Sequence, residues 1–243
     1  MLPLHDDNPS GTTPVVTYVL IAINVVVFLY QLTLGQTGLE RFFFEFGLVP
    51  REFFGEVRDL QTGQPVALNE FVPLLTNMFM HGGWLHLGGN LLFLYIFGDN
   101  VEDRLGHAQF LLFYLLGGII ASLAHAWSGP GSGIPSLGAS GAIGAVLGAY
   151  IVLYPHARIT TLAFLGFLIT TLRVPALIFL GVWFLMQSFQ GVAALGATST
   201  VESGGTAWWA HIGGFVFGLL GGAVARAMPK RRSPHADRWY SNR

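Results

Sequence analysis

A serine and a histidine set in apolar stretches are the residues of this chain best suited to covalent chemistry. Ser140 lies in the sequence GASG, and His211 lies in AHIGG. A serine hydroxyl attacks a carbonyl readily only when a base takes its proton, and histidine is the usual base. The chain contains no cysteine, which excludes thiol nucleophiles. Ser140 and His211 therefore predict a dyad of nucleophile and base.

Each of these two residues also has a simpler interpretation. A serine ahead of a glycine-rich stretch is often only a small packing residue, and a histidine in an apolar helix often bonds a neighbouring helix. No Asp or Glu lies inside the two apolar segments concerned, so the sequence offers no buried acid behind His211. The catalytic interpretation depends on the two side chains lying at the same depth.

Two further polar residues share one helix face. His86 and Asn90 are four positions apart, and both could donate hydrogen bonds to an oxyanion above Ser140. The alternative is that they bond neighbouring helices and hold the bundle together. His81 lies five positions before His86, on a different face, which argues against a metal site with two histidines. We expect neither a metal nor an organic cofactor.

The composition predicts a chain embedded in a lipid bilayer. Only 10% of the residues are charged and 52% are hydrophobic, whereas a soluble domain carries about 25% charged residues. So few charges cannot cover a globule with solvated side chains. The formal net charge of −1 provides no basic field, so we expect no nucleic acid partner.

Six apolar segments are long enough to be membrane spans, given that a span needs about 20 residues. They cover residues 15–34, 84–101, 110–127, 140–154, 176–195 and 208–228. The apolar stretch 159–172 is shorter and has an arginine beyond each end, so we interpret it as re-entrant or interfacial. The sequence thus predicts an all-α domain over 15–228, with six transmembrane helices. Its first outer loop, 35–72, mixes charges with phenylalanines and is expected to lie in the interface, although an ordinary loop is nearly as compatible.

The distribution of charge predicts the orientation in the membrane. With the N-terminus inside, nine of the 12 Lys and Arg residues fall on the inner side, as the positive-inside rule requires. Residues 1–14 are then a cytoplasmic tail, and 229–243 form a basic cytoplasmic tail. The start of the chain lacks the positive region of a signal peptide, so the first span is expected to be retained. We predict a multi-pass protein of a bacterial-type plasma membrane.

Segment length and small residues predict where Ser140 and His211 meet. The span that begins at Ser140 covers roughly 22 Å of a hydrocarbon core about 30 Å thick, which recesses Ser140 in a wet pit at a helix N-terminus. Glycines follow each residue at helical spacing: Gly144 and Gly148, and then Gly214, Gly218 and Gly222. Such rows let two helices approach closely. Because both spans run inward, the packing brings Ser140 and His211 side by side.

Taken together, these residues resemble the rhomboid family of intramembrane serine proteases. The resemblance runs from about residue 76 to 222. Four motifs appear in order: HGGWLHLGGN at 81–90, GDNVEDRLG at 98–106, GASG at 138–141 and AHIGGFVFG at 210–218. Four motifs on the expected spans are a specific signal, which one motif alone is not.

The resemblance implies a function and a role for each motif. It implies that Ser140 attacks the scissile carbonyl and that His211 is the general base. It also implies that His86, Asn90 and the Ser140 main-chain N–H stabilise the oxyanion. Glu102, between Gly98 and Gly106, is implied to join the inner end of its span to its neighbours. The substrates implied are single-pass transmembrane proteins with helix-destabilising segments, cut through an acyl-enzyme.

The chain departs from the family at two places. Many members carry a tyrosine that stacks on the catalytic histidine at the position of Gly144, so what orients His211 is an open question, with Trp208 and Trp209 as candidates. The first outer loop also lacks the Trp-Arg pair of many members. Two other classes stay open: a catalytically silent scaffold for transmembrane clients, and a solute transporter that uses the buried polar residues.

Overall fold

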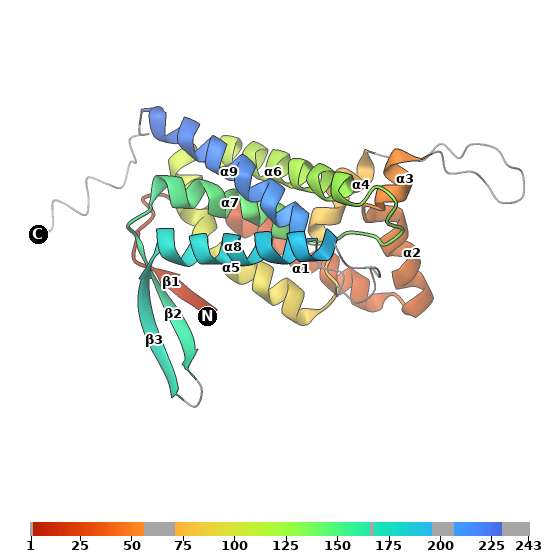
Figure 1. The fold of residues 1–243 in the computed structure, drawn as a ribbon, viewed down its shortest axis with the longest axis horizontal. Coiled ribbons are helices and arrows are strands. Elements are labelled where there is room, and N and C mark those ends of the chain that lie inside the picture. The colour runs from red at the N-terminus through yellow and green to blue at the C-terminus, as the bar shows by residue number, and fades with distance from the viewer. Residues whose placement is uncertain (1, 56–70, 166–167, 196–206, 230–243) are drawn as a thin grey trace, which may run out of the picture.

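The computed structural model describes residues 2–55, 71–165, 168–195 and 207–229, and its main part is a bundle of six long helices (Figure 1). These are α1 (Val15–Thr33), α5 (Trp84–Leu105), α6 (His107–Ser128), α7 (Ser140–Leu153), α8 (Ala176–Leu195) and α9 (Trp208–Ala227). Each occupies a predicted span. The largest difference is at the end of α5, which continues to Leu105 instead of stopping at residue 101.

Four of the helices among the described residues are long and apolar enough to cross a membrane, namely α1, α6, α9 and the Ala176–Ala193 part of α8. The other two differ for evident reasons. Helix α7 is apolar but has only 14 residues, which at 1.5 Å per residue is about 21 Å. Helix α5 has 22 residues, and its C-terminal end carries charged side chains from Asp99 to Arg104.

The prediction of an all-α chain is wrong, because one end of the bundle carries a three-stranded antiparallel sheet. Strands β2 (Arg158–Leu165) and β3 (Leu168–Pro175) pair from Arg158↔Pro175 to Leu165↔Leu168. The segment interpreted as re-entrant or interfacial is thus a β-hairpin. Its β-branched residues, in the sequences RITTLAFL and LITTLRVP, favour extended backbone.

The third strand comes from the other end of the sequence. Residues 2–6 of the predicted N-terminal tail form β1 (Leu2–Asp6), which pairs with β2 from Leu2↔Leu162 to Asp6↔Ile159. The Tyr150 hydroxyl of α7 donates a hydrogen bond to the Asp6 carboxylate. In Figure 1 the sheet projects from the bundle at the end where α9 stops, so the first and last described residues lie at the same end. Residues 230–243 of the predicted C-terminal tail lie outside the described residues.

The predicted first outer loop contains two short helices where it is described. Helix α2 (Gln36–Phe46) follows α1 directly, and α3 (Pro50–Phe54) begins at a proline. Leu48 and Ser136 exchange backbone hydrogen bonds, with Leu48 N–H donating to the Ser136 carbonyl at 3.1 Å and Ser136 N–H returning at 2.8 Å. This segment is therefore tied to the loop that leads into α7. Helix α4 (Val72–Thr76) and a 3-10 turn (Asn77–Phe79) then lead to α5.

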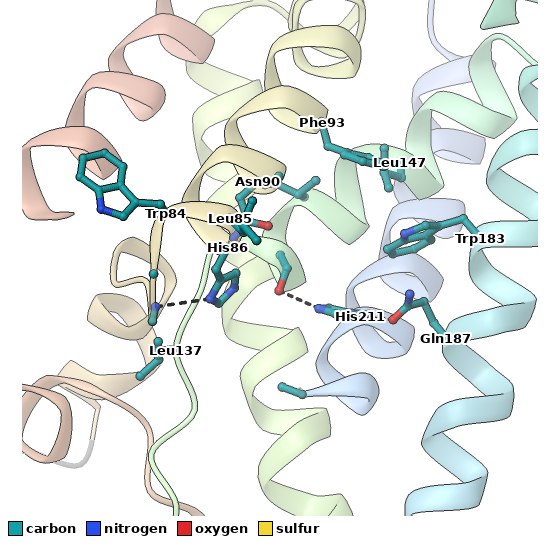
Figure 2. Close-up of a pocket in the computed structure, with 16 residues that line it drawn as sticks. Trp84, Leu85, His86, Asn90, Phe93, Leu137, Leu147, Trp183, Gln187 and His211 are labelled. Atoms are coloured by element: carbon teal, nitrogen blue, oxygen red, sulfur yellow. Dashed lines mark hydrogen bonds between the residues drawn. The ribbon is translucent and has the colours of Figure 1, made fainter. Parts of the chain in front are cut away.

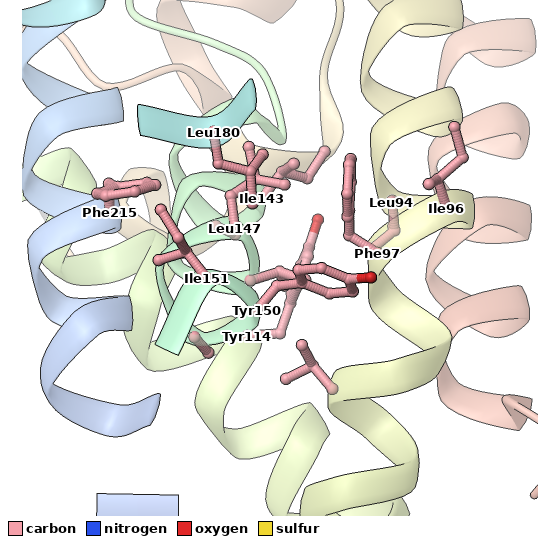
Figure 3. Packing of buried hydrophobic residues seen from close by; sticks show 14 of the residues in the cluster. Leu94, Ile96, Phe97, Tyr114, Ile143, Leu147, Tyr150, Ile151, Leu180 and Phe215 are labelled. Carbon is pink, nitrogen blue, oxygen red and sulfur yellow. The ribbon is translucent and has the colours of Figure 1, made fainter. Parts of the chain in front are cut away.

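Helix α7 lies at the centre of the bundle. Its residues from Gly141 to Ile151 are all buried, and Figure 3 shows Leu147 and Tyr150 of α7 packed toward Phe97 of α5. The rings of Phe97 and Tyr150 meet edge to face with centroids 5.0 Å apart. A central helix that is buried on every side explains why its apolar residues show no preferred face.

The motif of Gly98, Glu102 and Gly106 joins α5 to α1 and α6 at the C-terminal end of α5. The fully buried Glu102 carboxylate accepts hydrogen bonds from the Val16 N–H at 2.8 Å and from the Thr17 N–H and hydroxyl at 2.7 Å each. It therefore caps the N-terminus of α1, where a negative charge is favoured. Gly98 leaves room for Thr17, since a Cβ there would lie 3.0 Å from the Thr17 hydroxyl.

The same motif sets the turn between α5 and α6. Gly106 has a φ of +82°, a backbone conformation that favours glycine, and α6 begins at the next residue. His107, that next residue, brings its Nδ1 to 2.5 Å from the Glu102 carboxylate. The hydrogen bonds of Glu102 and the turn at Gly106 thus connect α5 to α1 and α6.

Candidate active site

A cavity of about 780 Å³ opens between helices α5, α7, α8 and α9. Four predicted site residues line it: His86, Asn90, Ser140 and His211. Figure 2 shows His86, Asn90 and His211 with Trp183 and Gln187, which line the same cavity from α8. The structure thus brings the four predicted residues together in one place.

Ser140 and His211 are in direct contact. The distance between the Ser140 hydroxyl oxygen and His211 Nε2 is 2.7 Å, which is a hydrogen bond. His211 is buried, with 8% of its surface exposed, whereas Ser140 is partly exposed to the cavity. An imidazole nitrogen in this place can take the hydroxyl proton as the oxygen attacks.

The glycine rows bring the two helices together as predicted. Added Cβ atoms at Gly214 and Gly218 of α9 would overlap the carbonyl oxygens of Gly141 and Ala145 on α7, and one at Gly148 of α7 would overlap the carbonyl of Phe215. Contact positions advance along both helices in the same direction, so α7 and α9 are parallel. This packing places Ser140 and His211 at one depth.

Ser140 is the first residue of α7, so its main-chain N–H belongs to the first turn, where helical N–H groups have no partner within the helix. The helix dipole adds partial positive charge there. The preceding loop is shaped by Gly138, which has a φ of +124°. A Cβ at Gly138 would come within 2.6 Å of His86 Nε2, so glycine is required for the close approach of His86.

Asn90 and His86 line the same cavity as Ser140, and His81 contacts both of their side chains. His81 Nε2 lies 2.9 Å from the Asn90 side-chain nitrogen, and the His81 ring meets the His86 ring edge to face at 5.0 Å. Gln31 of α1 holds the His81 backbone, since its amide bonds the His81 carbonyl at 2.7 Å and the His81 N–H at 3.1 Å. Sequence spacing did not predict that His81 contacts both residues, because it precedes α5.

The surroundings of His211 contain two residues that the sequence analysis missed. Gln187 of α8 places its side-chain oxygen 2.6 Å from His211 Nδ1. The Trp183 ring, one turn earlier on α8, lies over the imidazole with centroids 5.9 Å apart and a tilt of 36°. A polar Gln187 and a Trp183 four positions apart in an apolar span were the available signal.

Of the two tryptophans considered from the sequence, Trp208 contacts the histidine. Its ring meets that of His211 edge to face at 6.1 Å. The Trp209 indole N–H is buried and has no hydrogen-bond partner among the residues that the structure describes. Aromatic contact with His211 therefore comes from α8 and α9, whereas Gly144 of α7 lies against the His211 backbone. Within the described part of the chain, no group of three or more His, Cys, Asp or Glu residues is placed to hold a metal ion.

The family model described as Rhomboid domain matches residues 68–227, which is more than half of the chain. The chain belongs to the rhomboid family. This membership and the apolar helices make it a multi-pass integral membrane protein.

Several curated rhomboid relatives are similar over most of this chain. Rhomboid protein 1, mitochondrial, of Saccharomyces cerevisiae is 30% identical over 92% of the chain and 58% of the relative. Rhomboid protease GluP of Bacillus subtilis is 33% identical over 89% of the chain and 36% of the relative. Presenilin-associated rhomboid-like protein, mitochondrial, of Homo sapiens is 28% identical over 92% and 52%. The chain thus spans from about a third to somewhat over half of the length of these rhomboid relatives.

Proposed function

We propose that this chain is an intramembrane serine endopeptidase that cleaves transmembrane segments through the Ser140–His211 dyad. The observation that carries the proposal is the 2.7 Å hydrogen bond between the two side chains, at the first residue of a recessed helix and inside a cavity. The name of the Bacillus subtilis relative, a rhomboid protease, supports the same class of reaction.

The reaction proceeds through an acyl-enzyme. The Ser140 oxygen attacks the scissile carbonyl carbon while His211 Nε2 takes the hydroxyl proton, which gives a tetrahedral oxyanion. The C–N bond then breaks, and the imidazolium returns its proton to the leaving amine. A water molecule entering the cavity attacks the ester, again with His211 as base. The second product is a carboxylic acid, and Ser140 is regenerated.

The oxyanion is stabilised by donors around the start of α7. The Ser140 N–H and the positive end of the helix dipole lie where negative charge develops. We assign His86 and the Asn90 side-chain amide as additional donors, since both line the cavity beside Ser140. His81 orients Asn90 by the 2.9 Å contact between their side-chain nitrogens.

The membrane arrangement follows from the six long helices. We propose that all six cross the bilayer, with α7 recessed in the protein interior and the sheet and both chain ends on the cytoplasmic side. The substrates proposed are single-pass transmembrane proteins, presented from the surrounding lipid. Placement in a bacterial-type plasma membrane stays a prediction, because the relatives include proteins named as mitochondrial and one from a bacterium.

The proposal is tested with purified protein in lipid vesicles and a reporter carrying one transmembrane segment. The wild-type chain should cleave the reporter, and Ser140→Ala and His211→Ala should each abolish cleavage while inserting normally. Ser128→Ala is a matched control, since Ser128 ends α6 and bonds the His125 carbonyl. Cleavage that survives in Ser140→Ala would overturn the proposal.

A serine-directed fluorophosphonate probe separates the enzyme from a silent scaffold. Covalent labelling of the wild type that is lost in Ser140→Ala, and strongly slowed in His211→Ala, is the expected result. A silent scaffold would not be labelled above the level of the Ser140→Ala variant.

A further inference from the structure

The geometry points to Gln187 as a positioning residue that selects the reactive tautomer of His211. This inference rests on the proposed function, because it concerns the same dyad. Gln187 is buried on α8, with 9% of its surface exposed, and its side-chain oxygen lies 2.6 Å from His211 Nδ1. Figure 2 shows Gln187 beside His211. Gln187 is bonded to Nδ1 of the imidazole, whereas Ser140 is bonded to Nε2.

The reason lies in the chemistry of the imidazole ring. A neutral imidazole carries one proton, and only the nitrogen without it can accept the Ser140 hydroxyl proton. A side-chain oxygen next to Nδ1 accepts the Nδ1–H, which leaves a lone pair on Nε2. Because Nε2 is the atom 2.7 Å from the Ser140 oxygen, Gln187 keeps the base in the form that the attack requires.

The uncharged amide of Gln187 has part of the role that the carboxylate has in a Ser-His-Asp triad. It fixes the tautomer and the ring orientation, but it adds no negative charge to stabilise the imidazolium. In the apolar interior of a bundle, an ionised side chain is costly, whereas a neutral amide is tolerated more readily. Gln187 thus supplies the orienting acceptor without placing a charge between α8 and α9.

The neighbouring aromatic rings make this hydrogen bond geometrically specific. Trp183 lies four residues before Gln187 and therefore on the same face of α8, and its ring lies over the imidazole at 5.9 Å. Trp208 meets the ring edge-on from α9. With its faces and edges in contact, the His211 ring is held in a plane that aims Nδ1 at Gln187 and Nε2 at Ser140.

The first test removes the acceptor while keeping the size of the side chain. Gln187→Leu should lower kcat for the reporter by about 10- to 100-fold, the order of loss observed when the partner that orients a metal-bound histidine is removed. KM should change by less than about twofold, since Gln187 acts through His211. The matched control is Gln190→Leu, at an exposed position of α8, which should leave kcat unchanged.

The second variant restores the acceptor with a charge. Gln187→Glu should recover most of the activity at high pH. The acidic limb of its pH–rate profile should move to higher pH, because a carboxylate stabilises the protonated imidazole. Wild-type kcat in Gln187→Leu would overturn the inference. Equal losses in the Leu and Glu variants would overturn it too, because they would show that only side-chain shape matters.

A spectroscopic measurement tests the inference without any substrate. In protein with ¹⁵N-labelled histidine, the His211 signals, identified by their absence in His211→Ala, should show Nδ1 protonated and Nε2 unprotonated. Gln187→Leu should shift the population toward the other tautomer. Nε2 protonated in the wild type would overturn the inference. If the wild type cleaves no reporter but shows the expected tautomer, the proposed protease activity fails while the positioning role of Gln187 stands.

Discussion

Gly144 lies directly against the backbone of His211. A Cβ added at Gly144 would come within 3.0 Å of the His211 carbonyl oxygen and 3.4 Å of the Phe215 nitrogen. Helices α7 and α9 are therefore so close at this level that a side chain at position 144 of α7 would push against the α9 backbone. The aromatic partner of the histidine has to come from elsewhere, and Trp183 of α8 and Trp208 of α9 provide it.

This contact predicts that Gly144→Ala weakens the protein. The added methyl group has to push α7 away from α9, and overpacking of this kind costs about 1–3 kcal/mol. We expect a lower midpoint of thermal unfolding in detergent and slower cleavage, because the distance from Ser140 to His211 grows. Gly88→Ala on α5 is the control, since a Cβ at Gly88 would have no neighbour within 4 Å in the described part of the chain. Equal stability of both variants would contradict this account of the helix contact.

The buried Glu102 predicts a second stability effect. Glu102→Gln keeps one acceptor oxygen but removes the charge that bonds the first N–H groups of α1. Hydrogen bonds to charged groups contribute about 1.5–3 kcal/mol, so a fall of that order in unfolding free energy is expected. The Glu102→Gln substitution should also speed hydrogen exchange at the backbone amides of residues 15–17. Glu40→Gln, at an exposed position of α2, should leave both measurements unchanged.

The docking of β1 should depend on pH. Burial, together with the nearby charges of Asp99 and Asp7, raises the pKa of Asp6 from 3.8 to about 6, although the hydrogen bond from Tyr150 opposes the shift. A raised pKa means that the folded state favours the protonated carboxyl. The contribution of Asp6 to docking is thus full below about pH 4 and is lost as the pH rises through about 6.

Hydrogen exchange can follow this change in docking. After correction for the intrinsic pH dependence of exchange, the amides of β1 should be better protected at pH 5 than at pH 7. Asp6→Asn should remove the difference, because it carries no titrating group. A protection that is the same at both pH values in the wild type would contradict the prediction.

The absence of cysteine makes the topology directly testable, since each introduced cysteine is the only thiol in the chain. Thr13→Cys and His156→Cys should react with a membrane-impermeant maleimide only from the cytoplasmic side. Gly131→Cys, in the loop between α6 and α7, should react only from the opposite side. Labelling of Gly131→Cys and His156→Cys from the same side would exclude a membrane crossing by α7.

The positions of the long helices could be predicted from the sequence because the signal is local. A run of apolar residues ending in charges or glycines predicts a span whatever lies beside it. The shortness of α7 and its flanking turn residues placed its first residue correctly at Ser140. The prediction for the hairpin of β2 and β3 is wrong because its short apolar run resembles a re-entrant or interfacial segment. Its β-branched residues, which favour strands, are the better indicator. Strand β1 depends on pairing with residues about 155 positions away in sequence, which no local pattern reports.

The contact between Ser140 and His211 could be predicted from the sequence. The residues that surround and orient the His211 ring could not. Small residues at helical spacing specify which helix faces can touch, so they predicted that Ser140 and His211 meet. The environment of the imidazole depends on how α8 is rotated against α9, and α8 has no such row of small residues to indicate a contact face. The sequence therefore does not predict that Gln187 and Trp183 contact His211.

By itself, the sequence determined the chemistry available, the six long helices and the depth shared by Ser140 and His211. All three follow from residue type and from spacing along single helices. The tertiary structure decided how that chemistry is controlled: Gln187 bonded to His211, His81 bonded to Asn90, and β1 paired with β2. Each of these is a contact between separate elements, and its geometry is set by side-chain packing, which the periodicity of a single element does not contain.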